Sequence, residues 1–401
     1  MLLKRLYIFL ILCCMLNNFS ACNRASAGSN PPGPERLTSF RMHTPEVDTM
    51  AIIARSIRAA YKHTQLDSLY RIKAKKSGFN GNVLIAQKGV IVYQNCFGYS
   101  NYERKDSLTP ETRFQLASLS KTFTAVAVLK LIEDSLIHLT DKITDYFPAL
   151  PFKNVTVEML LDHRSGIANY VNIYSDQVEN QNLYPDNNDV IRWLEKCPRK
   201  FIDLPGRNFS YSNTNYLLLA SLVEKVACVS FSEYLHKNIL EPLGMNNTFL
   251  ITDSTEAAIG NRATSYTALW KMVKMNHLDR VVGDKGVYST IGDLYKWYDG
   301  LTHYKILKKE TLEEAWKPRS FESRGQRNYG YGFRMTVSDS EKVVYHNGWW
   351  NSCNTLFYMN PKRDYVIIVL GNKYNNEVYN IHNTVEIMNE SLNDDNEKMF
   401  E

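Results

Sequence analysis

The chain has 401 residues, of which 44% are hydrophobic and 22% charged. These are ordinary values for a globular protein, so the composition excludes a disordered chain and predicts a packed core. Lys and Arg together number 47 and Asp and Glu 42. The basic residues form no block, so nothing in the charge pattern supports nucleic-acid binding.

The first 22 residues have the order of a secretory signal. Lys4 and Arg5 precede an apolar run over residues 6–16, and short side chains follow, ending in Ser20-Ala21-Cys22. The apolar run is too short for a comfortable membrane span, whereas a charged start, an apolar middle and small residues at the end are typical of an export signal. We therefore expect an exported protein of the cell envelope.

The cysteine after this small pair resembles the lipobox of bacterial lipoproteins. The resemblance implies a signal peptide over residues 1–21 and lipid on the thiol and amine of Cys22, which would anchor the protein to a membrane, with the periplasmic face expected. Phe19 departs from the pattern, which usually has an aliphatic residue there. Ordinary cleavage near Ala21 or Ala27 and an uncleaved anchor are the alternatives.

Residues 22–46 predict a flexible tether, because they contain Pro and Gly and little apolar periodicity. One domain is expected over residues 47–395. It opens with a helix from about residue 48, whose apolar residues recur at helical spacing until the glycines of 78–81. Two β-rich runs then flank Gln87-Lys88-Gly89, which is typical of a hairpin.

The rest of the domain divides into a helical middle and a β-rich end. Residues 118–282 are mostly helical in pattern, three β-rich runs follow between 343 and 370, and a final helix is expected over about 377–392. Strands at both ends of a helical middle predict an α+β fold, in which one antiparallel sheet is flanked by helices and carries an inserted all-helical subdomain. The sheet part is expected over about 79–110 and 283–395, and the helical part over about 111–282.

Cysteines and histidines give no sign of a metal or cofactor. The nine histidines are scattered, without an H-E-x-x-H pattern, and we predict neither a cofactor nor a metal. Four cysteines lie downstream of Cys22, namely Cys96, Cys197, Cys228 and Cys353. Export permits disulfides between them without requiring any, and the sequence does not choose among the three possible pairings.

Ser118 and Lys121 stand three residues apart at the start of a strongly apolar helix. This spacing places both side chains on one helical face. A serine hydroxyl needs a base to become a nucleophile, and a desolvated lysine can be that base. The free N–H groups at a helix N-terminus would also suit a developing oxyanion. The pattern alone is weak, because it marks a solvated helix face more often than an active site.

The stretch over residues 114–125 resembles the first motif of the penicillin-recognising serine hydrolases, which include class C β-lactamases, DD-peptidases and carboxylesterases. That family carries two more motifs in fixed order, Y-x-N and then K-T-G or H-x-G. The resemblance extends over about residues 79–372. It implies a β-lactamase/transpeptidase-like fold and an acyl-enzyme on Ser118, and it leaves His163, in a framework segment, a structural role.

The second motif is identified by its context, because Y-x-N recurs along this chain. Tyr211-Ser212-Asn213 follows a Pro-Gly turn and precedes the apolar helix over 217–226, as in the family. The match implies that Tyr211 passes a proton between nucleophile and leaving group, since a phenol beside an ammonium group loses its proton more easily. Asn213 would hold the substrate carbonyl or the lysine. Whether Lys121 or Tyr211 is the general base stays open.

The third motif is His346-Asn347-Gly348, at the edge of a β-rich run. Gly348 would let a substrate backbone lie against the strand. The N–H of Trp349 would complete an oxyanion hole with the N–H of Ser118, and His346 is expected to bind substrate.

Two departures from the family bear on the substrate. His346 stands where dedicated class C β-lactamases have lysine, which favours a peptidase or esterase. Trp349 and Trp350 are expected to place two bulky rings beside the substrate strand, where enzymes that bind a penicillin carboxylate often have a small or hydroxyl residue.

The sequence thus favours an exported serine hydrolase, DD-peptidase- or esterase-like, that acts on an ester or amide. Its expected partner is a small molecule or peptide of the cell envelope. A β-lactamase and a non-catalytic lipoprotein that keeps the fold are the alternatives. An α/β-hydrolase is disfavoured, because no G-x-S-x-G elbow is present.

Overall fold

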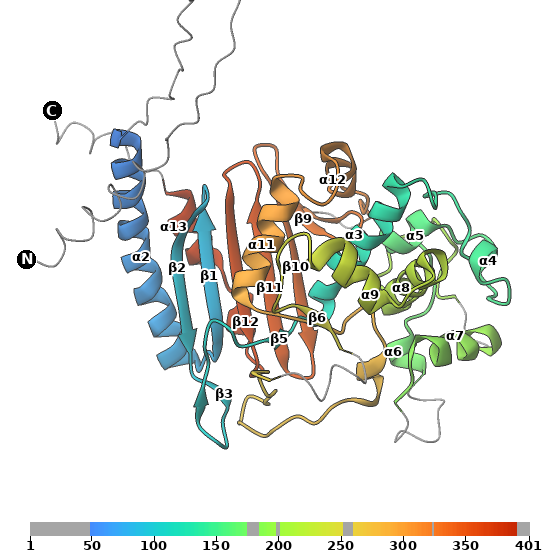
Figure 1. Cartoon of the computed structure of the whole chain (residues 1–401), viewed down its shortest axis with the longest axis horizontal. Helices are drawn as coiled ribbons and strands as arrows, with labels where there is room; N and C mark the ends of the chain where they lie inside the picture. The colour runs from blue at the N-terminus through green and yellow to red at the C-terminus, as the bar shows by residue number, and fades with distance from the viewer. Residues whose placement is uncertain (1–48, 175–183, 198–200, 252–259, 323–324, 391–401) are drawn as a thin grey trace, which may run out of the picture. The chain divides into compact units, whose positions relative to one another are not determined.

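A seven-stranded antiparallel sheet forms the centre of the domain (Figure 1). The computed structural model describes residues 49–174, 184–197, 201–251, 260–322 and 325–390, with side chains from residue 56 onward. The strands occur in the order β2-β1-β12-β11-β10-β9-β8. Their bounds are β1 Gly81–Gln87, β2 Val90–Phe97, β8 Arg327–Tyr329, β9 Arg334–Val337, β10 Lys342–Trp350, β11 Cys353–Asn360 and β12 Tyr365–Gly371.

Strands from the beginning and the end of the domain sequence meet in the sheet where β1 pairs with β12. Gly81 lies opposite Gly371 and Gln87 opposite Tyr365, so the early hairpin and the late strands share one sheet, as the sequence predicts. The turn between β1 and β2 has positive φ at Lys88 (50°) and Gly89 (77°). That is the turn geometry that matches the twist of a two-residue hairpin.

The central strands are buried on both faces, which explains their continuous apolar runs. In β1, Leu84 belongs to the core shared with the helical part, whereas its neighbours Val83 and Ile85 belong to a second core. The long helix α2 (Thr49–Ser77) and the short helix α13 (His382–Asn389) contribute to that second core. Helix α11 (Ile291–Thr302) packs on β1 and β12 from the other face.

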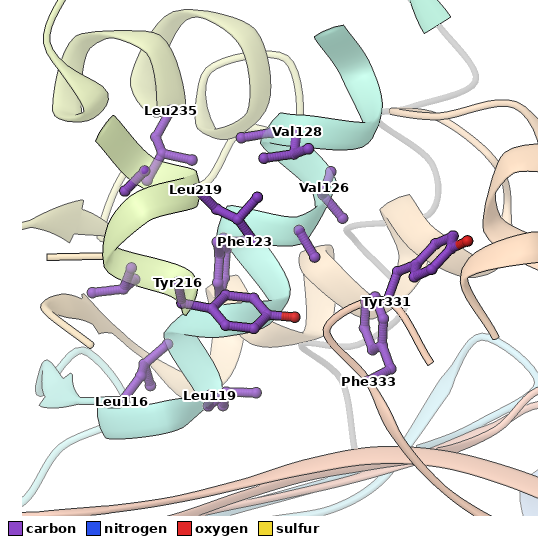
Figure 2. Packing of buried hydrophobic residues seen from close by; sticks show 14 of the residues in the cluster. Leu116, Leu119, Phe123, Val126, Val128, Tyr216, Leu219, Leu235, Tyr331 and Phe333 are labelled. Carbon is purple, nitrogen blue, oxygen red and sulfur yellow. The ribbon is translucent and has the colours of Figure 1, made fainter. Parts of the chain in front are cut away.

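The helical part is built around α3 (Ser120–Glu133) and α8 (Asn213–Ala227). Most residues of both helices are buried, and Figure 2 shows Phe123 of α3 and Leu219 of α8 close to one another in this core. Shorter elements pack against α8: α5 Val157–Leu161, α6 Tyr170–Ile173, α7 Asn187–Lys196 and α9 Phe231–Leu235.

Two features differ from the sequence expectation. A small sheet in the order β5-β7-β6 joins Phe114–Gln115, Val287–Ser289 and Phe249–Leu250, so the mostly helical stretch contains strand β6. The expected final helix over 377–392 is a 3₁₀ turn at Asn376–Val378 followed by α13. Among the described residues, Cys96, Cys228 and Cys353 form no disulfide.

The predicted signal peptide, Cys22 and the tether over 22–46 lie outside the described residues. Within the described part, no single helix has the length and apolar composition of a membrane span. Helix α8 reaches them only together with the segment Phe231–Leu240, from which it is bent by 81°.

The stacked pair of Trp297 in α11 and Phe123 in α3 generates a stability prediction. Their ring centroids lie 4.2 Å apart, and both side chains are fully buried. Trp297→Ala should lower the free energy of unfolding by about 3–5 kcal/mol, because it removes buried apolar surface and leaves a cavity. Leu136→Ala, at a position 56% exposed, should change it by less than about 0.5 kcal/mol. Urea denaturation followed by circular dichroism measures both, and equal losses would contradict the assignment of the core.

Candidate active site

Ser118 lies in a 3₁₀ turn, η1 (Ala117–Leu119), that leads directly into α3. The residue before it, Ala117, has φ of 52°, a left-handed conformation that residues with a side chain rarely adopt. Leu116 is fixed on two sides: its N–H donates to Val287 (2.8 Å) and its carbonyl accepts from the Thr355 hydroxyl (2.8 Å). The chain therefore turns sharply before Ser118, and its neighbours hold the strained residue in place.

Gly348 in β10 makes this turn possible by its lack of a side chain. A Cβ at this position would lie 2.2 Å from the Leu116 carbonyl oxygen and 2.4 Å from the Thr355 hydroxyl. It would also lie 3.1 Å from the Cβ of Ala117. The sheet and the serine turn approach so closely here that only glycine fits.

Lys121 is fully buried, and all three of its N–H donors have acceptors. Its Nζ lies 3.1 Å from Ser118 Oγ, 2.7 Å from Asn213 Oδ1 and 2.8 Å from the Asp284 carbonyl oxygen. The structure thus brings the predicted residues Ser118, Lys121 and Asn213 together. Asn213, the first residue of α8, contacts the lysine, which is one of the two alternatives left open above.

Tyr211 lies beside this group, surrounded by aromatic side chains and two positively charged side chains. Its ring centroid is 5.0 Å from Lys121 Nζ, 5.0 Å from the guanidinium carbon of Arg334 and 4.3 Å from the His163 ring centroid. The Tyr329 ring stands at 6.2 Å. These contacts fix the phenol next to the lysine that contacts the serine.

His163 supports Tyr211 from within the core. It is fully buried, and its Nδ1 accepts from the Ser212 N–H (3.2 Å) and lies 3.1 Å from the side-chain amide of Asn215. Burial, with the nearby charge of Lys121, holds the pKa of His163 well below 6.5. A neutral ring locked at the entry to α8 has a structural role.

His346 lies on the inner face of β10 and is also fully buried. Its Nε2 lies 3.2 Å from the Tyr329 hydroxyl, and burial, with the nearby charges of Arg334 and Lys121, holds its pKa well below 6.5. We expected this side chain to bind substrate. The structure instead places it against Tyr329, whose ring is one of those around Tyr211.

The expectation of two tryptophan rings beside the substrate strand is wrong for Trp349. Successive residues of a strand point to opposite faces, and Gly348 and Trp350 share one face while Trp349 points to the other. Trp349 is 62% exposed, with its ring 6.5 Å from that of Tyr374. The Trp350 indole donates to Asp279 and lies 4.8 Å from Lys285 Nζ. Applying the strand alternation to Gly348 would have given this result from the sequence.

A buried ion pair behind Lys121 was missed by the sequence analysis. Asp284, whose carbonyl holds Lys121, pairs through its carboxylate with Lys285 (3.3 Å) and accepts from the Tyr170 hydroxyl (3.2 Å). Burial lowers the pKa of Lys285. No spacing rule connects this segment to Ser118. The sequence signal that could have revealed the ion pair is the two adjacent charged residues, Asp284 and Lys285, which lie between two glycines in an apolar segment.

Within the described part of the chain, no cluster of three or more His, Cys, Asp or Glu side chains could hold a metal ion. The arrangement offers a serine hydroxyl in contact with a buried lysine, and a phenol ring beside that lysine. This set is suited to nucleophilic attack with proton transfer.

The close approach at Gly348 predicts a loss of Ser118 reactivity in Gly348→Ala. The added Cβ would force the serine turn and β10 apart, which should cost about 1–3 kcal/mol of stability and slow reaction with an acylating probe. Gly260→Ala is the matched control, because a Cβ there meets nothing within 4 Å. Thermal unfolding and labelling rates test the pair, and unchanged labelling in folded Gly348→Ala would contradict the proposed contact.

The buried neutral His346 predicts a pH dependence of stability. Its pKa in the folded state lies below the value of 6.5 expected on unfolding, so the unfolded chain binds the proton first. The associated stability is therefore present above pH 6.5 and decreases as the pH falls. Below 6.5 the free energy of unfolding should fall more steeply for the wild type than for His346→Gln, by up to about 1.4 kcal/mol per pH unit. Denaturant curves at several pH values measure this difference, and parallel curves for the two proteins would refute it.

Comparison with known proteins identifies the family. A family model described as Beta-lactamase matches residues 67–389. Penicillin-binding protein 4* of Bacillus subtilis (strain 168) is 28% identical over 332 residues, 79% of this chain and 73% of that protein. Protein flp of Staphylococcus aureus (strain MRSA252) is 26% identical over 320 residues, and the match spans 77% of this chain but 62% of that longer protein. The crystal structure of a penicillin binding protein from Bacillus halodurans superposes with a TM-score of 0.71 at 23% identity, covering 79% of this chain and 98% of that one. The chain belongs to the β-lactamase family of serine hydrolases, whose fold it shares.

Proposed function

We propose that the protein is a serine hydrolase that forms an acyl-enzyme on Ser118 with an ester or amide substrate, in the manner of a DD-peptidase or esterase. The observation that carries the proposal is the 3.1 Å contact between Lys121 Nζ and Ser118 Oγ. The lysine is buried and is oriented by two further acceptors, which fixes it on the serine.

In the proposed reaction, Ser118 Oγ attacks the substrate carbonyl carbon, and its proton passes to the neutral amine form of Lys121 or to the phenolate form of Tyr211. The carbonyl oxygen becomes an oxyanion that accepts hydrogen bonds from the backbone N–H groups of Ser118 and Trp349. The C–O or C–N bond to the leaving group then breaks, and Tyr211 with Lys121 returns the proton to the departing atom. Water activated by the same groups releases the acyl group and restores Ser118.

We further propose that the protein acts outside the cytoplasm, as a lipoprotein anchored through Cys22. The order of Lys4-Arg5, the apolar run and Ser20-Ala21-Cys22 supports this. An envelope location agrees with a small-molecule or peptide substrate of the cell envelope.

A β-lactamase is the second candidate, and it has less support. In that reading the third motif would contribute a cation to bind a penicillin carboxylate. In this chain the corresponding residue is His346, which is fully buried and neutral.

Two covalent probes test the proposal on the domain lacking residues 1–22. A fluorophosphonate and a fluorescent penicillin should each be examined by intact mass. We expect one fluorophosphonate adduct that is absent in Ser118→Ala. Lys121→Met should slow its formation by about 10²- to 10⁴-fold, because the proton acceptor is lost.

Lys237→Met, at an exposed lysine, is the matched control and should label at the wild-type rate. Rapid release of hydrolysed penicillin would favour the β-lactamase instead. Absence of any adduct on folded protein would overturn the serine hydrolase assignment and leave the non-catalytic lipoprotein as the better explanation.

A further inference from the structure

Trp350 lies at the end of β10, on the face of the strand that meets the serine turn. Residues two apart in a strand point to the same face, so Trp350 shares the face of Gly348, which approaches Leu116 and Ala117. A strand rises about 3.3 Å per residue, which places Trp350 about 7 Å along β10 from this approach. The indole is therefore the next side chain on this face beyond the turn that carries Ser118.

Two contacts hold the indole of Trp350 in place. Its N–H donates to the carboxylate of Asp279, and its ring lies 4.8 Å from the ammonium group of Lys285. Asp279 is buried and is itself fixed, because it accepts from the Asn276 N–H (2.6 Å) and from the side-chain amide of Asn351 (2.9 and 2.8 Å). Rotating the indole away would remove one donor from a buried carboxylate, which costs free energy. The ring is thus fixed rather than adaptable.

Lys285 and Tyr170 extend this surface toward α8. The ammonium group of Lys285 contacts two rings, at 4.8 Å from that of Trp350 and 5.2 Å from that of Tyr170. Tyr170 is fully buried, and its N–H donates to the Thr214 hydroxyl near the start of α8 (2.8 Å). The carbonyl of Asp284, next to Lys285 in the chain, holds the buried lysine of the site. Trp350, Lys285 and Tyr170 together form one wall, which we call the indole wall.

The position of Tyr211 decides which end of a substrate meets the indole wall. In the proposed reaction Tyr211 returns a proton to the departing atom, so the leaving group lies on the side of this phenol. The Tyr211 ring is 6.2 Å from that of Tyr329, whose hydroxyl lies 3.2 Å from His346. His346 precedes Gly348 on β10, whereas Trp350 follows it. The leaving group therefore extends toward His346, and the acyl group extends toward Trp350.

The two ends of the site differ in the room that they offer. A cavity of about 780 Å³ lies on the leaving-group side, where Phe209, Tyr329 and Tyr345 contribute to its lining. Its volume is in the range of about 300–1,000 Å³ that small-molecule sites occupy. No residue of the indole wall is among the described residues that line it. A large leaving group has room there, whereas the acyl group meets a fixed indole.

We propose that Trp350 is a specificity-determining residue that limits the acyl group of the substrate to a short chain, so that the enzyme hydrolyses esters or amides of acids about as small as acetate. A longer chain would have to displace the indole, and packed side chains tolerate little added volume. This inference rests on the proposed function, since it names the substrate class of the same site.

The kinetic test uses p-nitrophenyl acetate and p-nitrophenyl hexanoate, which share the leaving group and differ in the acyl chain. In the wild type, kcat/KM should be lower for the hexanoate by about tenfold or more, as expected for overpacking. Trp350→Ala should raise kcat/KM for the hexanoate by about tenfold or more and change that for the acetate by less than about threefold. Trp350→Phe keeps a ring but has no indole N–H for Asp279, so its preference should fall between those of the two proteins.

Two controls show that the effect belongs to the acyl side. The ratio of kcat/KM for p-nitrophenyl acetate and 4-methylumbelliferyl acetate, which differ only in the leaving group, should be the same in the wild type and in Trp350→Ala. A changed ratio with an unchanged acyl preference would place the indole on the leaving-group side and overturn the inference. Trp270→Ala removes a tryptophan that stacks on Tyr102 with ring centroids 4.2 Å apart, and it should leave the preference for acetate unchanged. Thermal unfolding establishes that each variant is folded.

A binding arm separates this inference from the proposed function. In Ser118→Ala, calorimetry should show tighter binding of N-acetylbenzylamine than of N-hexanoylbenzylamine, and adding Trp350→Ala should abolish the difference. This result would support the role of Trp350 even if Ser118 failed to label. Equal binding of the two amides to Ser118→Ala, binding of neither, or a preference for the acetyl amide that persists after Trp350→Ala would overturn the inference.

Discussion

The buried ammonium group of Lys121 is the constraint on which the site depends. A charge removed from water is tolerated only when hydrogen-bond acceptors replace the lost solvent, and Lys121 has three, on Ser118, Asn213 and Asp284. These residues come from η1, from the start of α8 and from the segment before β7. Packing of α3 against α8 therefore does more than bury apolar surface, because it brings Asn213 to Lys121 and so completes the set of hydrogen-bond acceptors around the ammonium group. The same three contacts hold the ammonium group against the serine hydroxyl.

The second constraint is steric, where the sheet meets the helical part. Ala117 is held at positive φ because Leu116 is bonded on both sides and because Gly348 leaves room beneath it. Strain of this kind persists only where the surrounding structure determines the conformation. Strands β10 and β11 hold this conformation in place, because they are paired throughout Val344–Trp350. The rigid sheet thus fixes the position from which Ser118 faces the site.

Positive charge dominates the surroundings of Ser118. Lys121 Nζ and the guanidinium carbon of Arg334 each lie 5.0 Å from the Tyr211 ring centroid. The two buried histidines, His163 and His346, stay neutral because burial and these two charges lower their pKa values. Asp284 compensates Lys285, whereas Arg334 has no such partner in the described part of the chain. An environment of this sign favours the oxyanion of the proposed reaction.

The sequence by itself determined the fold class, the pairing of the early hairpin with the late strands, and the group of Ser118, Lys121, Tyr211 and Asn213. It could do so because periodicity fixes which elements form, and because three short motifs occur in a fixed order. The faces of Trp349 and Trp350 also follow from the alternation of side chains along β10, whereas tertiary structure decided the contact of His346 with Tyr329 and the places of Asp284 and Arg334. These residues lie far from Ser118 along the chain, and their roles arise from burial and from charges that meet only after folding. Such contacts cannot be predicted from the local sequence, because the interaction free energy of a charged side chain depends on its distance in space from its neighbours and on its exposure to water.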